Sequence, residues 1–194
     1  MTVSTDRHTS ETVLNVPNQL TAARLLLAIG VFVLLPLERY VSALVVFLIA
    51  STTDWIDGYW ARKYGQVTQL GRIFDPFVDK ILICGTFIYL TAEAGSGVLP
   101  WMAVVVVGRE LLVTALRGYM EQRGADFSAK IPGKLKMVFQ CAAVVASLVA
   151  LHYGTTNLPS WSLWTLAVLV WLAILSTIYS GVDYVFAAVK LLRQ

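Results

Sequence analysis

Six long apolar stretches constrain the fold of this chain more than any other feature of its sequence. Several of them reach or approach the length of about 20 residues that a helix needs to cross a bilayer. Only 14% of the residues are charged, so a soluble helical bundle of 194 residues could not cover this much apolar surface. The sequence therefore predicts an all-α integral membrane protein with six transmembrane helices, expected at Leu20–Leu37, Val41–Lys63, Leu70–Ala92, Pro100–Arg123, Lys134–Tyr153 and Trp161–Leu192.

Basic residues are distributed unevenly between the connections of these helices. The connections 38–40, 93–99 and 152–160 contain one arginine and no lysine, whereas the opposite side carries most of the basic residues, including the stretch 117–136. Because basic connections stay in the cytoplasm, both termini are expected there. The predicted organisation is a cytoplasmic tail (1–16), ending in a short juxtamembrane segment, and a single membrane domain (17–194).

Four aspartates lie in the second and third apolar stretches, where charged residues are rare. Asp54 and Asp57 are three residues apart and Asp75 and Asp79 four apart, so each pair lies on one face of a helix. The pairs are nearly symmetric about Gln66, which in an antiparallel hairpin places Asp57 level with Asp75 and Asp54 level with Asp79. All four carboxylates are thus expected at one depth, about 10 Å from the loop.

Four ionised carboxylates cannot share a half-buried site without counter-charge, because repulsion and desolvation would protonate them. Two divalent cations would balance them, and all-oxygen ligation suits Mg²⁺ or Mn²⁺. Gly58 and Ala61 remove side-chain bulk beside Asp57, as a site needs if a substrate is to reach the metals. Helix capping, close packing or a turn at Asp75-Pro76 would each explain one part of this pattern, but not the whole.

The string D-x2-D-G-x2-A-R-x8-G-x3-D-x3-D over residues 54–79 resembles the signature of the CDP-alcohol phosphotransferase family. The resemblance implies transfer of a phosphatidyl-type group from a CDP-linked lipid to an alcohol, with release of CMP, by a homodimer of the cell (inner) membrane with a cytoplasmic site. It also implies that Asp79 is both a metal ligand and the base for the acceptor hydroxyl. By the same resemblance, the other metal ligands are Asp54, Asp57 and Asp75, and the cytidine diphosphate site is lined by Gly58, Ala61, Arg62 and Gly71.

A second group of charged residues lies near the cytoplasmic ends of the fourth and fifth apolar stretches. Arg109 directly follows an apolar run and needs an anionic partner or ligand, and Arg117, Lys134 and Lys136 lie nearby in the sequence. Positive-inside charge with snorkelling side chains is the simpler explanation for Arg123 and Lys130, which lie at the same end. Together the other four residues predict a binding site for an acceptor that carries its own phosphate. The pattern resembles family members that join CDP-diacylglycerol to sn-glycerol 3-phosphate.

Two alternatives remain open at this level. Related enzymes use an inositol phosphate, phosphatidylglycerol or serine as acceptor, and of these the basic cluster favours the phosphorylated one. A divalent-cation transporter would also place aspartates in membrane helices, but it predicts acids near the midplane and an inverted repeat. Nothing in the sequence indicates a nucleic-acid partner.

Overall fold

A computed structural model of the protein describes residues 16–64, 69–122 and 131–192, and this part of the chain is helical, with short turns and no strand. The helix ends agree with the expected spans to within four residues, so the all-α prediction is confirmed. The described helices are α1 (Val16–Leu34), α2 (Tyr40–Tyr64), α3 (Gln69–Leu90), α4 (Pro100–Gln122), α5 (Ile131–Tyr153) and α6 (Ser160–Leu192).

Two helical segments of the described chain are long and apolar enough to cross a membrane. They are Leu135–Tyr153 in α5 and Ser160–Lys190 in α6. The helices α1 and α2 contain shorter apolar segments, 19–34 and 40–53. Six membrane crossings therefore stay a prediction.

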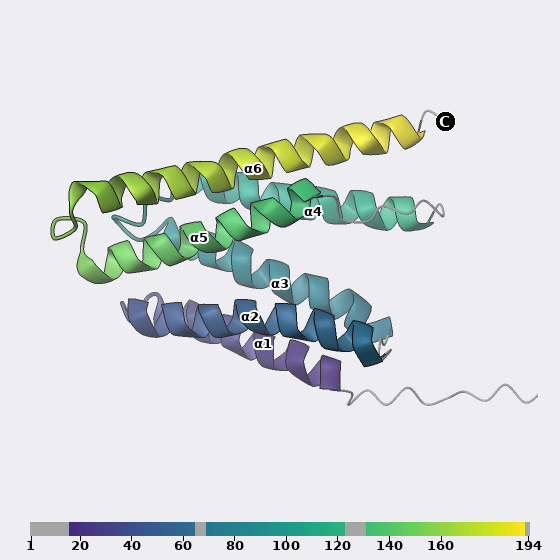
Figure 1. The fold of residues 1–194 in the computed structure, drawn as a ribbon, viewed down its shortest axis with the longest axis horizontal. Helices are drawn as coiled ribbons and strands as arrows, with labels where there is room; N and C mark the ends of the chain where they lie inside the picture. Colours follow the sequence, from purple (N-terminus) through teal and green to yellow (C-terminus); the bar gives the residue numbers. More distant parts are fainter. Residues whose placement is uncertain (1–15, 65–68, 123–130, 193–194) are drawn as a thin grey trace, which may run out of the picture.

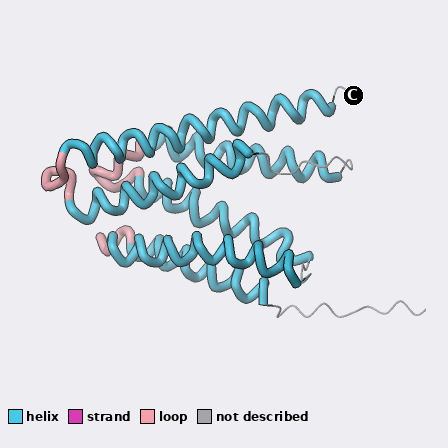
Figure 2. Tube along the Cα trace, in the orientation of Figure 1, coloured by secondary structure: helices cyan, strands magenta, loops and turns pink. Residues whose placement is uncertain are grey.

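The helices form a bundle in which α3 lies in the middle. Figure 1 shows α1 and α2 side by side at one edge and α4, α5 and α6 together at the other. Consecutive helices run in opposite directions, so the beginning of α1 and the end of α6 lie at the same end of the bundle. Figure 2 shows the described loops at the opposite end.

Local chemistry explains where two of the helices begin and end. The helix α5 starts at Ile131, three residues before the expected Lys134, because Pro132 fits in a first helical turn, where no N–H is needed. It ends before Gly154, which has a φ of 75° and donates its N–H to the Ala150 carbonyl at 3.0 Å. This left-handed glycine is a common helix terminator.

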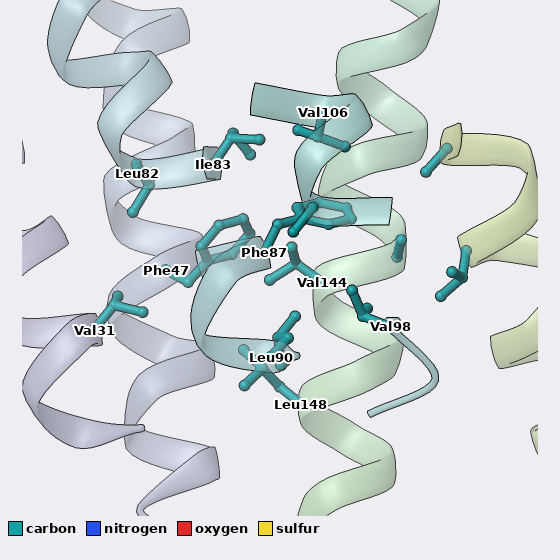
Figure 3. Packing of buried hydrophobic residues seen from close by; sticks show 14 of the residues in the cluster. Val31, Phe47, Leu82, Ile83, Phe87, Leu90, Val98, Val106, Val144 and Leu148 are labelled. Atoms are coloured by element: carbon teal, nitrogen blue, oxygen red, sulfur yellow. The ribbon is translucent and has the colours of Figure 1, made fainter. Parts of the chain in front are cut away.

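The core of the bundle is built around α3. Figure 3 shows Phe87 of α3 between residues of α2, α4 and α5, including Phe47, Val106 and Val144, and all four are fully buried. Many large apolar side chains on the outer helix faces are instead exposed; Trp164, for example, is 73% exposed. An apolar core inside an apolar outer surface is typical of helices that face hydrocarbon rather than water.

A glycine permits an unusually close approach between α1 and α3. The Phe32 ring lies where a side chain on Gly85 would be, since a Cβ there would be 2.2 Å from the nearest ring atom. One turn further along α3, the Tyr89 ring stacks on Phe32 with centroids 5.4 Å apart. The loop end of α3 is thus held against α1 by aromatic packing.

A hydrogen bond joins two connections at the loop end of the bundle. The hydroxyl of Tyr40, the first residue of α2, donates to Glu93 Oε2 at 2.9 Å. Burial, the hydrogen bond and the negative charge of Glu93 together raise the pKa of Tyr40 to about 12. This contact connects the α1–α2 turn to the α3–α4 loop.

Candidate active site

The predicted metal ligands lie on α2 and α3, towards the ends that the short connection joins. Asp54 lies ten residues before the last residue of α2, and Asp79 lies ten after the first residue of α3. Asp57 and Asp75 are seven and six residues from the same ends. These positions agree with the expected common depth.

Most of these side chains lie outside the part that the structure describes, so their convergence stays a prediction. The same holds for the four residues predicted to line the cytidine diphosphate site and for Lys134. The backbone places every one of them within a helix: Asp54, Asp57, Gly58, Ala61 and Arg62 in α2, Gly71 and Asp75 in α3, and Lys134 in α5.

Asp79 is the one predicted ligand whose side chain is described, and it is partly buried on α3. Its carboxylate interacts electrostatically with Lys136 of α5 and with its neighbour Lys80. Lys80 also interacts with Arg109 and Arg117 of α4. The fold therefore brings an aspartate of the first predicted site within electrostatic range of Lys136, a basic residue of the second.

The centre of the basic region is a buried ionic triad between α4 and α5. Arg109, Glu110 and Lys136 are 9%, 6% and 7% exposed. The Nη1 of Arg109 donates to Glu110 Oε1 at 3.2 Å, and the Lys136 ammonium pairs with the same carboxylate oxygen. The anionic partner that we expected for Arg109 is its neighbour Glu110. Lys136 of the next helix pairs with the same carboxylate.

Two residues of α6, Ser180 and Tyr184, complete this cluster, and sequence reasoning missed both. The Nη2 of Arg109 donates to Ser180 Oγ, and the Arg109 guanidinium lies 5.5 Å from the centroid of the Tyr184 ring. Arg117 lies 6.0 Å from the same centroid and donates from Nη2 to the Tyr184 hydroxyl at 3.2 Å. Ser180 and Tyr184 lie four residues apart on one face of α6. This spacing was the signal available in the sequence, but it is hidden in a long apolar helix.

A small residue and a polar pair fix the position of α6 against its neighbours. Gly181 leaves room for the aliphatic part of Arg109, whose Cγ would be 3.2 Å from a Cβ at that position. About one turn away, the buried amide of Gln140 donates to Thr177 Oγ1 at 2.9 Å. Such a hydrogen bond inside an apolar core sets the register of α6 on α5, because either partner alone would be costly to bury.

The charges of the cluster do not cancel. Its described side chains include four cations and two carboxylates, so positive charge is in excess. Of these side chains, only Arg109, Glu110 and Lys136 are buried, with one net positive charge between them, while Lys80, Arg117 and Asp79 are partly exposed. An uncompensated buried charge is unfavourable, and in a membrane protein such a charge is a candidate functional group. The arrangement can bind a doubly charged anion such as a phosphate monoester. The positively charged members are Lys80, Arg109, Arg117 and Lys136, and the negatively charged members are Asp79 and Glu110.

Comparison with known proteins places this site in a family. The model of the CDP-alcohol phosphatidyltransferase family matches residues 14–179, which include both predicted sites. The chain belongs to this family of enzymes, as the aspartate signature indicated.

Several curated relatives match along most of their length and carry one name, CDP-diacylglycerol–glycerol-3-phosphate 3-phosphatidyltransferase. The protein from Bacillus subtilis (strain 168) is 35% identical over 187 residues, which cover 88% of this chain and 93% of the relative. The protein from Pseudomonas fluorescens is 35% identical over 181 residues, covering 90% of each. The protein from Escherichia coli (strain K12) is 31% identical over 180 residues, covering 90% of this chain and 94% of the relative.

Proposed function

We propose that the enzyme transfers the phosphatidyl group of CDP-diacylglycerol to sn-glycerol 3-phosphate, forming phosphatidylglycerophosphate and CMP. The observation that carries this proposal is the cluster with excess positive charge, which has a buried centre at Arg109, Glu110 and Lys136 and includes Asp79 within electrostatic range of Lys136. A phosphate on the acceptor would bind the cluster and leave the acceptor hydroxyl near the aspartates. The name shared by the relatives supports the same donor and acceptor.

The chemistry needs one bond to form and one to break at the phosphatidyl phosphorus. The acceptor hydroxyl oxygen forms the new bond to this phosphorus, the bond between the same phosphorus and the bridging oxygen of the diphosphate breaks, and CMP leaves with the bridging oxygen. We assign to Asp79 the removal of the hydroxyl proton, which is general base catalysis by a positioned carboxylate. Arg109, Arg117, Lys134 and Lys136 are assigned to the phosphate of the acceptor.

The donor set on α2 and α3 fits two Mg²⁺ or Mn²⁺ ions, because it consists of four carboxylates at matched helical positions. Asp54, Asp57, Asp75 and Asp79 would hold the ions, which when bound neutralise charge on the attacking and leaving oxygens. Gly58, Ala61, Arg62 and Gly71 would hold the cytidine diphosphate beside them.

The apolar outer surface, and the start of α1 and the end of α6 at one end of the bundle, support a multi-pass enzyme of the cell (inner) membrane. Its six helices would cross the membrane with the site and both termini towards the cytoplasm, since the last turns of α2 and α6 and the first turn of α3, which contain Arg62, Lys63, Arg72 and Lys190, belong to that end. We also propose a homodimer, as the family resemblance implies. Crosslinking in native membranes, followed by mass measurement, tests it.

An acceptor panel tests the proposed reaction. Purified protein, CDP-diacylglycerol and Mg²⁺ or Mn²⁺ are combined with glycerol 3-phosphate, an inositol phosphate, phosphatidylglycerol or serine, and CMP release is measured. We expect release with glycerol 3-phosphate, its loss on chelation by EDTA, and its return when either ion is added back. Release with another acceptor only would reassign the substrate, and release with none would favour the cation transporter.

A further inference from the structure

We propose that Tyr184 is a positioning residue for the acceptor phosphate, because it holds Arg109 and Arg117 in the orientation that binds it. The proposal rests on the proposed function, since it presumes that these arginines serve the acceptor. Tyr184 lies on α6, far in sequence from both arginines and outside every motif described above.

The geometry sets Tyr184 apart from a core tyrosine that only fills space. Its side chain is 3% exposed, and its ring contacts two guanidinium groups, with centroid distances of 5.5 Å to Arg109 and 6.0 Å to Arg117. A cation over an aromatic face is stabilised electrostatically within about 6 Å, more so when water is excluded. One ring therefore stabilises two like charges that would otherwise repel each other.

The hydroxyl of Tyr184 contributes a separate constraint. It accepts a hydrogen bond from Arg117 Nη2 at 3.2 Å. Gly133 at the start of α5 lies beside it, since a Cβ there would be 3.7 Å from the hydroxyl oxygen. The tyrosine thus connects α4 and α6 at the point where α5 begins, next to Lys134 and Lys136 of the predicted phosphate site.

Tyr184 fixes Arg117 more strictly than Arg109. Arg109 is also held by Glu110 and Ser180. The described interactions of the Arg117 side chain are its contacts with Tyr184 and electrostatic repulsion from Lys80 and Arg109. Loss of the tyrosine should therefore release Arg117 first and weaken phosphate binding without altering the aspartates.

Steady-state kinetics of Tyr184→Leu and Tyr184→Phe test the proposal. Tyr184→Leu removes the ring and the hydroxyl, so we expect the KM for glycerol 3-phosphate to rise about tenfold, with kcat and the KM for CDP-diacylglycerol within about twofold. Tyr184→Phe retains the ring, so its KM for the acceptor should rise about threefold. Tyr179→Leu, on the same helix but 65% exposed, is the matched control and should change neither KM.

A double-mutant cycle with Arg117→Gln separates positioning from general stability. If the hydroxyl acts through Arg117, Tyr184→Phe should add no further increase in KM once Arg117 is replaced. The proposal would be overturned if the increases in KM caused by the two single substitutions multiplied in the double variant. It would also be overturned if the KM for glycerol 3-phosphate and the KM for CDP-diacylglycerol rose equally. If Tyr184→Leu does not fold in detergent, the Tyr184→Phe cycle decides alone. Turnover of glycerol 3-phosphate by the unaltered enzyme is measured in parallel, so failure of the proposed function is seen separately.

Discussion

The two predicted sites of this enzyme are built in different ways. The aspartate site comes from 26 consecutive residues, 54–79, on two adjoining helices. The basic cluster takes side chains from α3, α4, α5 and α6, and its first and last members along the chain, Asp79 and Tyr184, are more than one hundred residues apart. A local site leaves its complete pattern in the sequence, whereas a site assembled by tertiary packing leaves only fragments.

The largest expected effect comes from the local site. Asp75→Asn removes one of four carboxylates that we expect to share two ions, and turnover should fall by about a thousandfold or more, because charge on the reacting oxygens would no longer be neutralised. CMP release measures turnover, and titration with Mn²⁺ should show weaker metal binding. Glu38→Gln, an exposed carboxylate at the loop end, is the control. Retained activity of Asp75→Asn would contradict the two-metal account.

A smaller loss of turnover is expected for Asp79→Asn, and this variant should separate the two roles proposed for Asp79. As a base, its replacement in Asp79→Asn should lower kcat by about 10²- to 10³-fold. Binding of CDP-diacylglycerol, measured by equilibrium competition with a labelled donor, should weaken much less. An equal loss of binding and turnover would leave Asp79 as a ligand only. Because Asp79 interacts with Lys136, this variant probes the junction of the two sites.

Substitutions in the basic cluster should change the KM for the acceptor rather than kcat. Arg109→Ala removes one charged donor, and the KM for glycerol 3-phosphate should rise about 10- to 100-fold. The KM for CDP-diacylglycerol should change by less than about threefold. Lys134→Ala should behave in the same way. A larger effect on the donor would mean that the cluster serves the cytidine diphosphate instead, and the contrast between the two sites would be lost.

The smallest effect is expected at the loop end, away from both sites. Tyr40→Phe removes the hydrogen bond to Glu93 and should lower the free energy of unfolding by about 1 kcal/mol at neutral pH, with unchanged turnover. Because folding raises the pKa of Tyr40 from 10.0 to about 12, its contribution is complete below about pH 10 and is lost as the pH rises towards 12. Thermal unfolding of both proteins should therefore converge over that range. A difference that stayed constant with pH would contradict this assignment.

Much of the fold could be predicted from the sequence because apolar length and charge distribution constrain a chain of this kind strongly. The helix ends differed where local chemistry competes with hydrophobicity, as at Pro132, which starts α5 early. Arg109 could be identified as a cation that needs a partner. Its contacts with Ser180 and Tyr184 could not, because they depend on the rotation of α6, which Gly181 and the Gln140–Thr177 hydrogen bond determine.

The close contact of Gly85 with the Phe32 ring has a consequence for how sequences of this enzyme can change. Any side chain at position 85 would collide with the ring, so either the ring would turn away and lose its stacking on Tyr89, or α3 would move away from α1. Asp79 and Lys80 lie on the same rigid helix, about one and a half turns away, so that displacement would reach the chemistry. Positions 32 and 85 are therefore expected to change together, with a smaller residue at one accompanying a larger residue at the other.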